Sequence, residues 1–361
     1  MTDIRYWIGL SLVSEVGPVM SRKLLAVMGS PENVFSAALK DLAAVRGLSR
    51  EKAERIKNFG QWDTVERQLS ITEKKGIKVL SYDDPAYPEV LKDVEGSPIV
   101  LYMKGDYHAD DRFGIAVVGS RKHTHYGEVV AQKISGELAA AGFTIISGMA
   151  RGIDTLSHKS ALSIGGRTIA VLGSGLDVYY PAENRGLMEK IVSSGCVISE
   201  FPPGTMPNRE NFPRRNRLIS GLSLGVLVVE ATSESGSLIT AQYAVEQNKE
   251  VFAIPGDITS ANSEGTNSLI RQGARIVTNT NDIIEELAPA LKGFIRINNR
   301  QAPEMSEEER GLCSVLTREP KHIDVLSREA ALPAQKILGV LLSLELKGIV
   351  RQSNGKRFYL S

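Results

Sequence analysis

The chain has 361 residues, 42% of them hydrophobic, which is enough for two or three domains with at least one large core. Its 43 basic and 42 acidic residues leave a formal net charge of +1, which excludes a polybasic protein that coats duplex DNA or a membrane surface. No apolar stretch approaches the ~20 residues that span a bilayer, and the run from Tyr6 to Leu12 is too short for a signal peptide. The two cysteines, Cys196 and Cys313, stand in apolar contexts, which predicts buried free thiols in a reducing cytoplasm.

Residues 1–75 predict an all-helical domain that contains two similar phrases. The phrases around Gly17 and Gly47 each combine an apolar helix end, a glycine that can take a positive φ, and a helix with early basic residues. This pattern resembles a pair of helix-hairpin-helix units of the SAM-like type, which clamp nucleic-acid backbone through hairpin N–H groups. Plain helical packing is the alternative. The proline-rich turns from Asp83 to Pro98 predict a linker and a domain boundary near residue 80.

From about residue 112 to 290, short β-branched runs alternate with amphipathic helices. Continuous apolar strands separated by helices are typical of a parallel, doubly wound sheet that is covered on both faces. The sequence therefore predicts an α/β fold with a Rossmann-like domain over residues 76–292, whose ligand crevice lies outside the carboxyl ends of the strands. The expected strands are 115–118, 144–147, 168–172, 197–200, 226–230, 251–254 and 275–277.

The end of the chain predicts a separate small unit over residues 305–361, joined by a polar linker over 293–304. Helices are expected at 306–316, 323–330 and 333–347, followed by a hairpin from Ile349 to Tyr359 with a type I′ turn at Asn354-Gly355. Three helices and a hairpin are the order of a winged helix. Residues 301–361 carry nine basic and eight acidic side chains, so duplex binding by this unit is disfavoured.

The stretch from Asn208 to Ser220 gathers four arginines and Asn216 around one aromatic residue, Phe212. Pro213 can begin a helix, because its missing N–H would be unpaired there. Arginines at a helix N-terminus indicate that an anion binds there, and a neighbouring aromatic ring can stack on a base. The pattern predicts a groove for single-stranded nucleic acid; a solvated helix with a core phenylalanine is the alternative. The four arginines are Arg209, Arg214, Arg215 and Arg217.

Glycine turns with polar residues follow nearly every expected strand. Gly119-Ser120-Arg121 comes directly after the first of them, and Ser235-Gly236-Ser237 follows another; both can bond a phosphate. The chain contains neither a G-x-G-x-x-G fingerprint nor a G-x-x-x-x-G-K-[ST] loop, which disfavours NAD chemistry and ATP hydrolysis. No cofactor is expected.

Other polar residues predict structural roles rather than chemistry. His123 and His125 lack neighbours with metal-ligand spacing, so no metal is expected. Asp154 and His158, four residues apart on one helix, could form an acid–base pair, but capping and packing are favoured. The carboxylates that end two of the expected strands, Glu200 and Glu230, could be catalytic, or they could cap and orient arginine side chains.

Eight phrases of the central region occur in one order, among them Gly119-Ser-Arg-x-x-Thr-x-Tyr-Gly127 and Phe212-Pro-Arg-Arg-Asn-Arg217. Together they resemble the DNA-processing protein A (DprA/Smf) family. The helical start and the C-terminal winged helix are similar to those of the longer family members. The remaining phrases lie at 147–154, 170–177, 180–181, 199–204, 235–241 and 265–274.

The resemblance implies a cytoplasmic bacterial protein that binds incoming single-stranded DNA in natural transformation, shields it and helps to load RecA onto it. It implies a homodimer formed through the Rossmann-like domain, and no catalytic activity. Gly119, Ser120 and Arg121 would hold phosphates, with Ser235, Gly236 and Ser237 nearby, and Phe212 would meet a base. Family members tend to carry a lysine where this chain has Arg209, which still supplies the charge. The expected DNA-binding residues are these and Arg214, Arg215, Asn216 and Arg217.

Two other functions are weighed against this one. Related Rossmann-like phosphoribohydrolases of the lysine-decarboxylase-like class process nucleotides with a glutamate three residues after a threonine; counted from Thr240, this chain has Tyr243 there, which cannot serve as the carboxylate. A duplex-specific transcription regulator would depend on the winged helix, whose balanced charge disfavours it.

Overall fold

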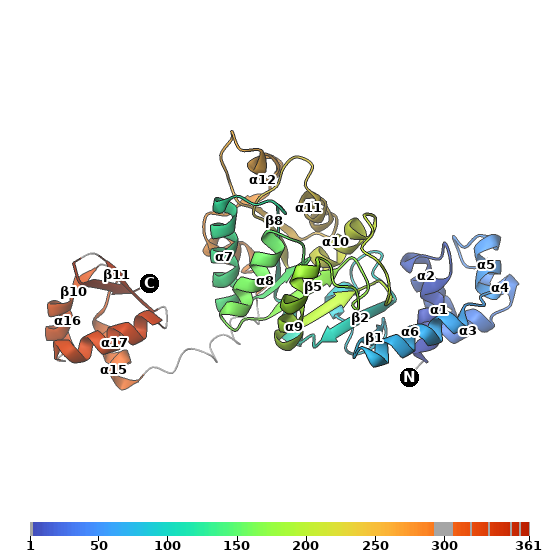
Figure 1. The fold of residues 1–361 in the computed structure, drawn as a ribbon, viewed down its shortest axis with the longest axis horizontal. Helices are drawn as coiled ribbons and strands as arrows, with labels where there is room; N and C mark the ends of the chain where they lie inside the picture. Colours follow the sequence, from blue (N-terminus) through green and yellow to red (C-terminus); the bar gives the residue numbers. More distant parts are fainter. Residues whose placement is uncertain are drawn as a thin grey trace. The chain divides into compact units, whose positions relative to one another are not determined.

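The computed structural model describes residues 3–291, 306–317, 320–330, 333–346, 349–353 and 355–360. The chain divides into two compact units, Met1–Phe294 and Ile295–Ser361, and Figure 1 shows the elements of each. The linker predicted over residues 293–304 lies outside the described residues.

The first unit contains helices before, between and after its strands. Its α-helices are α1 (Ile4–Leu12), α2 (Pro18–Met28), α3 (Pro31–Ser36), α4 (Leu39–Ala43), α5 (Arg50–Lys57), α6 (Trp62–Lys74), α7 (His125–Ala140), α8 (Ile153–Ser163), α9 (Arg185–Ser194), α10 (Asn211–Gly221), α11 (Gly236–Glu246), α12 (Ala261–Arg271) and α13 (Thr280–Leu287). Its strands are β1 (Lys78–Ser81), β2 (Val100–Gly105), β3 (Gly114–Val118), β4 (Thr144–Ser147), β5 (Thr168–Leu172), β6 (Cys196–Ser199), β7 (Gly225–Val228), β8 (Glu250–Ala253) and β9 (Arg275–Ile276). Short 3-10 turns occur at η1 (Glu89–Leu91), η2 (Ala109–Arg112) and η3 (Ala182–Asn184).

The helices α1 to α6 confirm the predicted helical N-terminal region. Three begin at short polar caps, Asp3, Ser30 and Ser49, whose side chains accept backbone N–H groups of the first turn. Gly47 takes the expected positive φ of 91°, but Gly17 does not: its φ is −74°, because the residue before Pro18 is held in extended conformation. The buried face of these helices shares one hydrophobic core with β2, β5 and α9, so they are packed onto the sheet.

The nine-stranded sheet has the order β1-β2-β6-β5-β4-β3-β7-β8-β9. From β6 to β9 all neighbours are parallel, which confirms the doubly wound α/β prediction. The linker expected near residue 80 is wrong, because β1 and β2 add to the edge beside β6 as antiparallel strands. The prolines between them belong to a packed connection, in which Tyr87 is buried and its hydroxyl donates to the Pro98 carbonyl at 2.8 Å.

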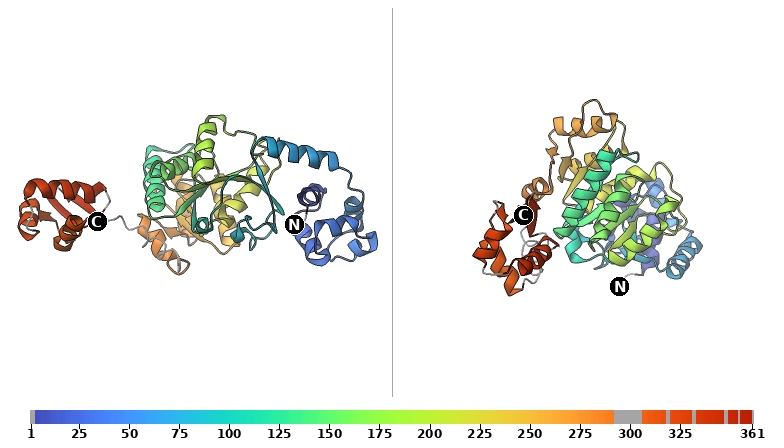
Figure 2. Two further views of the ribbon diagram at one scale, coloured as in Figure 1. Left: turned by 90° about the horizontal axis from the view of Figure 1, so that it is seen from below. Right: turned by 60° about the vertical axis from the view of Figure 1, so that its left-hand side comes forward.

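Helices cover both faces of the sheet (Figures 1 and 2). Alternate residues of the strands point to opposite sides: Ile115 and Val117 pack with α7, α8 and α13, whereas Ala116 and Val118 pack with α10 and α11. Strand β3 pairs with β4 on one side and with β7 on the other. The strand order therefore runs outward from β3 in both directions, through β4 to β6 on one side and through β7 to β9 on the other. Ligand crevices of doubly wound sheets form at this reversal, outside the carboxyl ends of the strands.

The second unit is a winged helix, as predicted. It contains α15 (Glu307–Val315), α16 (Ile323–Glu329), α17 (Ala334–Leu346) and a sheet of β10 (Lys321–His322), β12 (Arg357–Leu360) and β11 (Val350–Ser353). Ser353 pairs with Arg357, and Gly355 and Lys356 take positive φ; Asn354, the first residue of the predicted turn, lies outside the described residues. Cys196 is buried as expected, but Cys313 is only half-buried.

Candidate nucleic-acid interface

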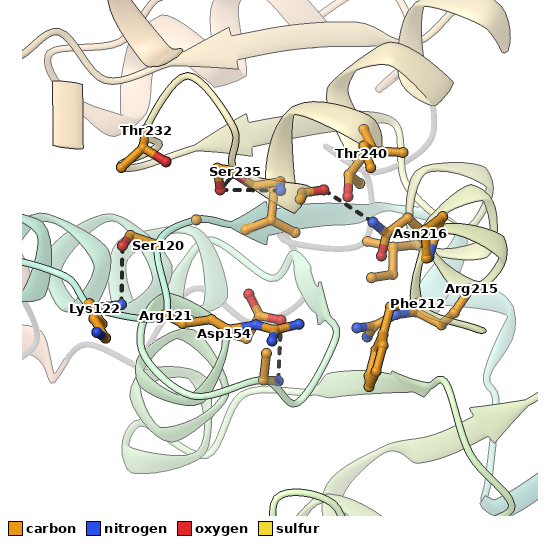
Figure 3. A pocket seen from close by; sticks show the side chains of 18 of the residues that line it. Ser120, Arg121, Lys122, Asp154, Phe212, Arg215, Asn216, Thr232, Ser235 and Thr240 are labelled. Carbon is orange, nitrogen blue, oxygen red and sulfur yellow. Dashed lines mark hydrogen bonds between the residues drawn. The ribbon is translucent and has the colours of Figure 1, made fainter. Parts of the chain in front are cut away.

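A pocket of about 540 Å³ opens at the carboxyl ends of β3 and β7, and Figure 3 shows the side chains that line it. We call it the trough. Its walls are the loop after β3, the first turns of α10 and α11, and the start of α8. These segments are far apart in sequence and meet because β3 and β7 are neighbours at the reversal of strand order. The expected residues that line the trough are Gly119, Ser120, Arg121, Phe212, Arg215, Asn216, Ser235, Gly236 and Ser237.

The loop after β3 brings the backbone close to the start of α8. A Cβ at Gly119 would lie 2.8 Å from Ile153 Cγ1 and 3.0 Å from the Glu230 carbonyl oxygen, so glycine is required there. The Ser120 carbonyl accepts the Ile153 N–H at 3.2 Å, and its hydroxyl accepts the Lys122 N–H at 3.1 Å. This anchoring leaves Arg121 exposed, with its guanidinium carbon 5.5 Å from the centre of the Phe212 ring.

Phe212 stands inside α10, not just before it. The helix begins at Asn211, two residues earlier than Pro213 indicates, and Pro213 occupies a first-turn position where its missing N–H removes no bond. The N-cap residue, Glu210, makes no side-chain cap bond. The Phe212 ring is half-buried, with the Tyr180 ring 5.7 Å away, so it is neither a core residue nor fully solvated.

Arg215 and Asp154 form the floor of the trough, and His158 lies buried behind it. Arg215 donates from Nη1 to the Val171 carbonyl at 2.6 Å, and Gly148 is glycine because a Cβ there would fall 1.9 Å from that nitrogen. Burial lowers the pKa of Arg215 to about 10 although Asp154 opposes the shift, so the guanidinium stays charged at neutral pH. Asp154 accepts the N–H groups of Gly148 at 3.1 Å and Ala150 at 3.3 Å; burial raises its pKa, and Arg215 counteracts this.

The surroundings of His158 confirm the predicted packing role and not the acid–base role. Burial, reinforced by the charge of Arg215, lowers the pKa of His158 to about 3, so the ring is neutral. Its Nδ1 lies 2.6 Å from the Thr168 hydroxyl, while the Asp154 carboxylate is directed to backbone N–H groups. The two side chains therefore hold α8 in place.

The first turns of α10 and α11 meet at the upper wall. Ser235 caps α11 by accepting the Ser237 N–H at 3.4 Å, and the two hydroxyls lie 2.7 Å apart. Asn216 donates from Nδ2 to the Gly236 carbonyl at 3.2 Å, which ties the helices together. The N-termini of two helices thus open on one pocket, and partial positive charge at helix N-termini favours an anion.

The other three predicted arginines do not line the trough. Arg217 is turned toward Glu200, with Nη2 2.5 Å from Oε2, and only 12% of its side chain is exposed. Arg214 lies 3.4 Å from the same oxygen and 5.1 Å over the Phe201 ring. Glu200 therefore orients arginines, one of its two predicted roles. Arg209 is exposed in the loop before α10, and it has no ion pair or hydrogen bond with any residue that the structure describes.

Some lining residues were missed by the sequence reasoning. Lys122 follows Arg121 and extends the cationic loop, so its position was a usable signal. Thr232 and Asn262 come from a loop and from the first turn of α12, and only folding brings them to the trough; Asn262 donates to the Lys122 carbonyl at 3.1 Å. Glu230, which the sequence analysis did name, serves as a cap: it accepts the Thr124 N–H at 2.9 Å at the start of α7.

No three His, Cys, Asp or Glu side chains gather as metal ligands in the described part of the chain. Among those same residues, none of the helices has the length and apolar character to cross a membrane. The trough itself combines Arg121, Lys122 and Arg215 with one buried carboxylate, Asp154, beside a half-exposed aromatic ring. This arrangement suits a phosphate together with a flat apolar ring.

The chain is similar to known proteins over most of its length. A family model described as DNA recombination-mediator protein A matches residues 78–288, a model of the DprA winged helix domain matches 298–356, and a SAM-like helix-hairpin-helix tandem matches 9–59. The Smf protein of Synechocystis is 34% identical over 390 residues, covering 98% of each chain.

Solved structures also share the fold. DNA processing protein A from Streptococcus pneumoniae has a TM-score of 0.67 and 36% identity, covering 79% of this chain and 99% of that one. The Helicobacter pylori protein, whose structure is described for its single-stranded DNA binding mode, has a TM-score of 0.54 and 30% identity, covering 59% of this chain and 96% of that one. With the central family model spanning more than half of its residues, the chain belongs to the DNA-processing protein A (DprA/Smf) family.

Proposed function

We propose that this protein binds single-stranded DNA without sequence specificity, with the trough as the binding site. The observation that carries the proposal is the convergence of Arg121, which follows β3, and Phe212, in the first turn of the helix between β6 and β7: the Arg121 guanidinium carbon lies 5.5 Å from the centre of the Phe212 ring. A cation beside an aromatic platform can hold a phosphate and stack a base, and any base offers a π-face. The Helicobacter pylori relative, which is described as binding single-stranded DNA, supports the same ligand class.

In this proposal the loop from Gly119 to Arg121 and the turn from Ser235 to Ser237 hold phosphates. Arg215 supplies fixed charge from below, and Phe212 stacks a base. Asn216 positions α11 rather than reading a base, because its amide group already donates to Gly236. Arg209 and Arg214 reach DNA from the outside of α10, and Arg217 keeps that helix in register through Glu200.

The finer role follows the family resemblance. The protein acts in the cytoplasm as a homodimer formed through its Rossmann-like domain, shields single strands and helps to load RecA onto them during natural transformation and recombination. It has no catalytic activity. At the place of the phosphoribohydrolase glutamate the chain has Tyr243 in α11, and the trough carboxylate, Asp154, is held by backbone N–H groups and faces Arg215.

Competition between oligonucleotides tests the proposal. A labelled oligo-dT of about 20 nucleotides should bind, and unlabelled oligo-dT should displace it at far lower concentration than a duplex of equal length. Arg121→Ala should weaken binding and lower the slope of log K against log salt by about 0.7, because one fewer counterion is released from a single strand. Equal competition by duplex, or an unchanged slope, would remove the trough as a single-strand site.

A further inference from the structure

A second cleft of about 540 Å³ also borders α10. Its walls are the hairpin between α1 and α2, the start of β2, and the segment that follows β6. Both cavities are lined by the first turn of α10: Pro213 and Arg215 face the trough, and Arg214 between them faces the cleft. A single strand that crosses this turn would therefore pass from one cavity to the other.

Two buried polar atoms of residues that line the cleft have no hydrogen-bond partner among the described residues. The Glu200 side chain is 3% exposed, and its Oε2 receives both Arg217 and Arg214, whereas Oε1 has no hydrogen-bond partner among the described residues. The Ser21 hydroxyl, in a residue that is 1% exposed, is likewise unpaired. A buried polar atom without a partner costs about 1–3 kcal/mol, so a ligand that satisfies it gains affinity.

The chemistry of these groups selects the ligand. An ionised carboxylate only accepts hydrogen bonds, so the ligand must bring an N–H group to Glu200 Oε1. A phosphate has no N–H group to donate, so it cannot satisfy Glu200 Oε1. Apolar lining from Pro98, Val100 and Pro202 suits the faces of a flat ring, and the exposed Arg214 at the edge suits a phosphate of the same strand.

We propose that the cleft is a base-binding subsite for a nucleotide of the strand held in the trough, and that it prefers bases with an exocyclic amine. It rests on the proposed function. Cytosine directs its N4 amine to Glu200, whereas thymine has a carbonyl oxygen at the same place, which the carboxylate repels. The trough holds any base, and the cleft adds a preference at one position.

Fluorescence anisotropy with labelled oligo-dC and oligo-dT of equal length tests the subsite on the full chain. Oligo-dC should bind about fivefold or more tightly, the lower end of discrimination by a base-edge contact. Gly17 lines the cleft with φ −74°, and a Cβ there would meet no atom within 4 Å, so Gly17→Trp fills the cleft without backbone strain. This variant should bind oligo-dC no better than oligo-dT.

Gly186→Trp is the matched control, because Gly186 is an exposed residue of α9 with open space around it and lines neither cavity. It should keep the oligo-dC preference. Equal binding of the two oligomers by the unchanged protein, or a preference that survives in Gly17→Trp, overturns the subsite alone. Failure of both oligomers to bind overturns the proposed function and the subsite with it. If circular dichroism shows that Gly17→Trp is unfolded, the comparison of oligo-dC with oligo-dT in the unchanged protein still tests the subsite.

Discussion

Arg215 on the floor of the trough and Arg121 on its rim lie 5.9 and 5.5 Å from the centre of the same Phe212 ring. Arg215 is 4% exposed and bonded to a main-chain carbonyl, with Asp154 as its counter-charge, whereas Arg121 is exposed and has no ion pair among the described residues. A buried, bonded cation shapes the site, and an exposed cation is available to a ligand. Substitutions in the floor should therefore change stability, and substitutions in the rim should change binding.

The largest effect is expected from removing the floor cation. Arg215→Met leaves the Asp154 carboxylate buried without its counter-charge, which should lower the free energy of unfolding by about 3–5 kcal/mol. Arg121→Met should change it by about 0.5 kcal/mol or less, because surface substitutions seldom do more. Urea unfolding followed by tryptophan fluorescence reports on this unit, since both tryptophans, Trp7 and Trp62, lie in its helices. Similar losses in the two variants would erase the distinction between floor and rim.

Lowering the pH should destabilise the folded protein by protonating His158, which is buried behind the floor of the trough. Its pKa is about 3 in the folded state against an ordinary 6.5, so the stability from the neutral ring is fully present above pH 6.5 and is lost as the pH falls toward 3. Between pH 7.5 and pH 5 this amounts to about 2 kcal/mol of unfolding free energy. His158→Gln should lack that part of the pH dependence, and His123→Gln should retain it. Parallel curves for His158→Gln and the unchanged protein would contradict a neutral buried ring.

The sequence was sufficient for the architecture because the strands are continuous apolar runs and the helices are amphipathic. It was not sufficient for β1 and β2. Prolines between Asp83 and Pro98 are typical of a linker, and only tertiary packing shows that Tyr87 is buried beneath them. Local pattern cannot reveal β2, because its partner β6 comes about a hundred residues later in the chain.

The basic stretch of α10 shows the same limit at the site. Its arginines look alike in sequence, yet alternate positions of one helix face different neighbours. Arg215 lines the trough, whereas Arg214 and Arg217 form ion pairs with Glu200, which follows β6. Which arginine is free depends on where the carboxylates lie in space, and that depends on strand order. The glycine turn at Gly119–Arg121 could be placed at the trough from the sequence, because its glycine and its polar residues are adjacent in the chain.

Phe212 lies between floor and rim and should show an intermediate effect. Phe212→Ala should weaken oligo-dT binding by about 1–3 kcal/mol, the range for loss of one stacked base. Phe212→Tyr keeps the ring and should bind nearly as well. Anisotropy titrations measure both, and circular dichroism melts show whether the fold is retained. A drop in melting temperature without a change in the affinity of the folded protein would return Phe212 to a packing role.

The smallest effect is expected at Arg209, which is exposed and lies outside the trough. Arg209→Ala should leave unfolding unchanged and lower the slope of log K against log salt by about 0.7, because it removes one phosphate contact. Arg209→Lys should restore the slope, since a lysine can neutralise a phosphate as a point charge. Arg185→Ala is the matched control, because Arg185 is also exposed but lines neither cavity and pairs with Glu189. A slope that falls equally in the control would show that the effect comes from overall charge rather than from a phosphate contact at Arg209, and the DNA path would then end at Phe212.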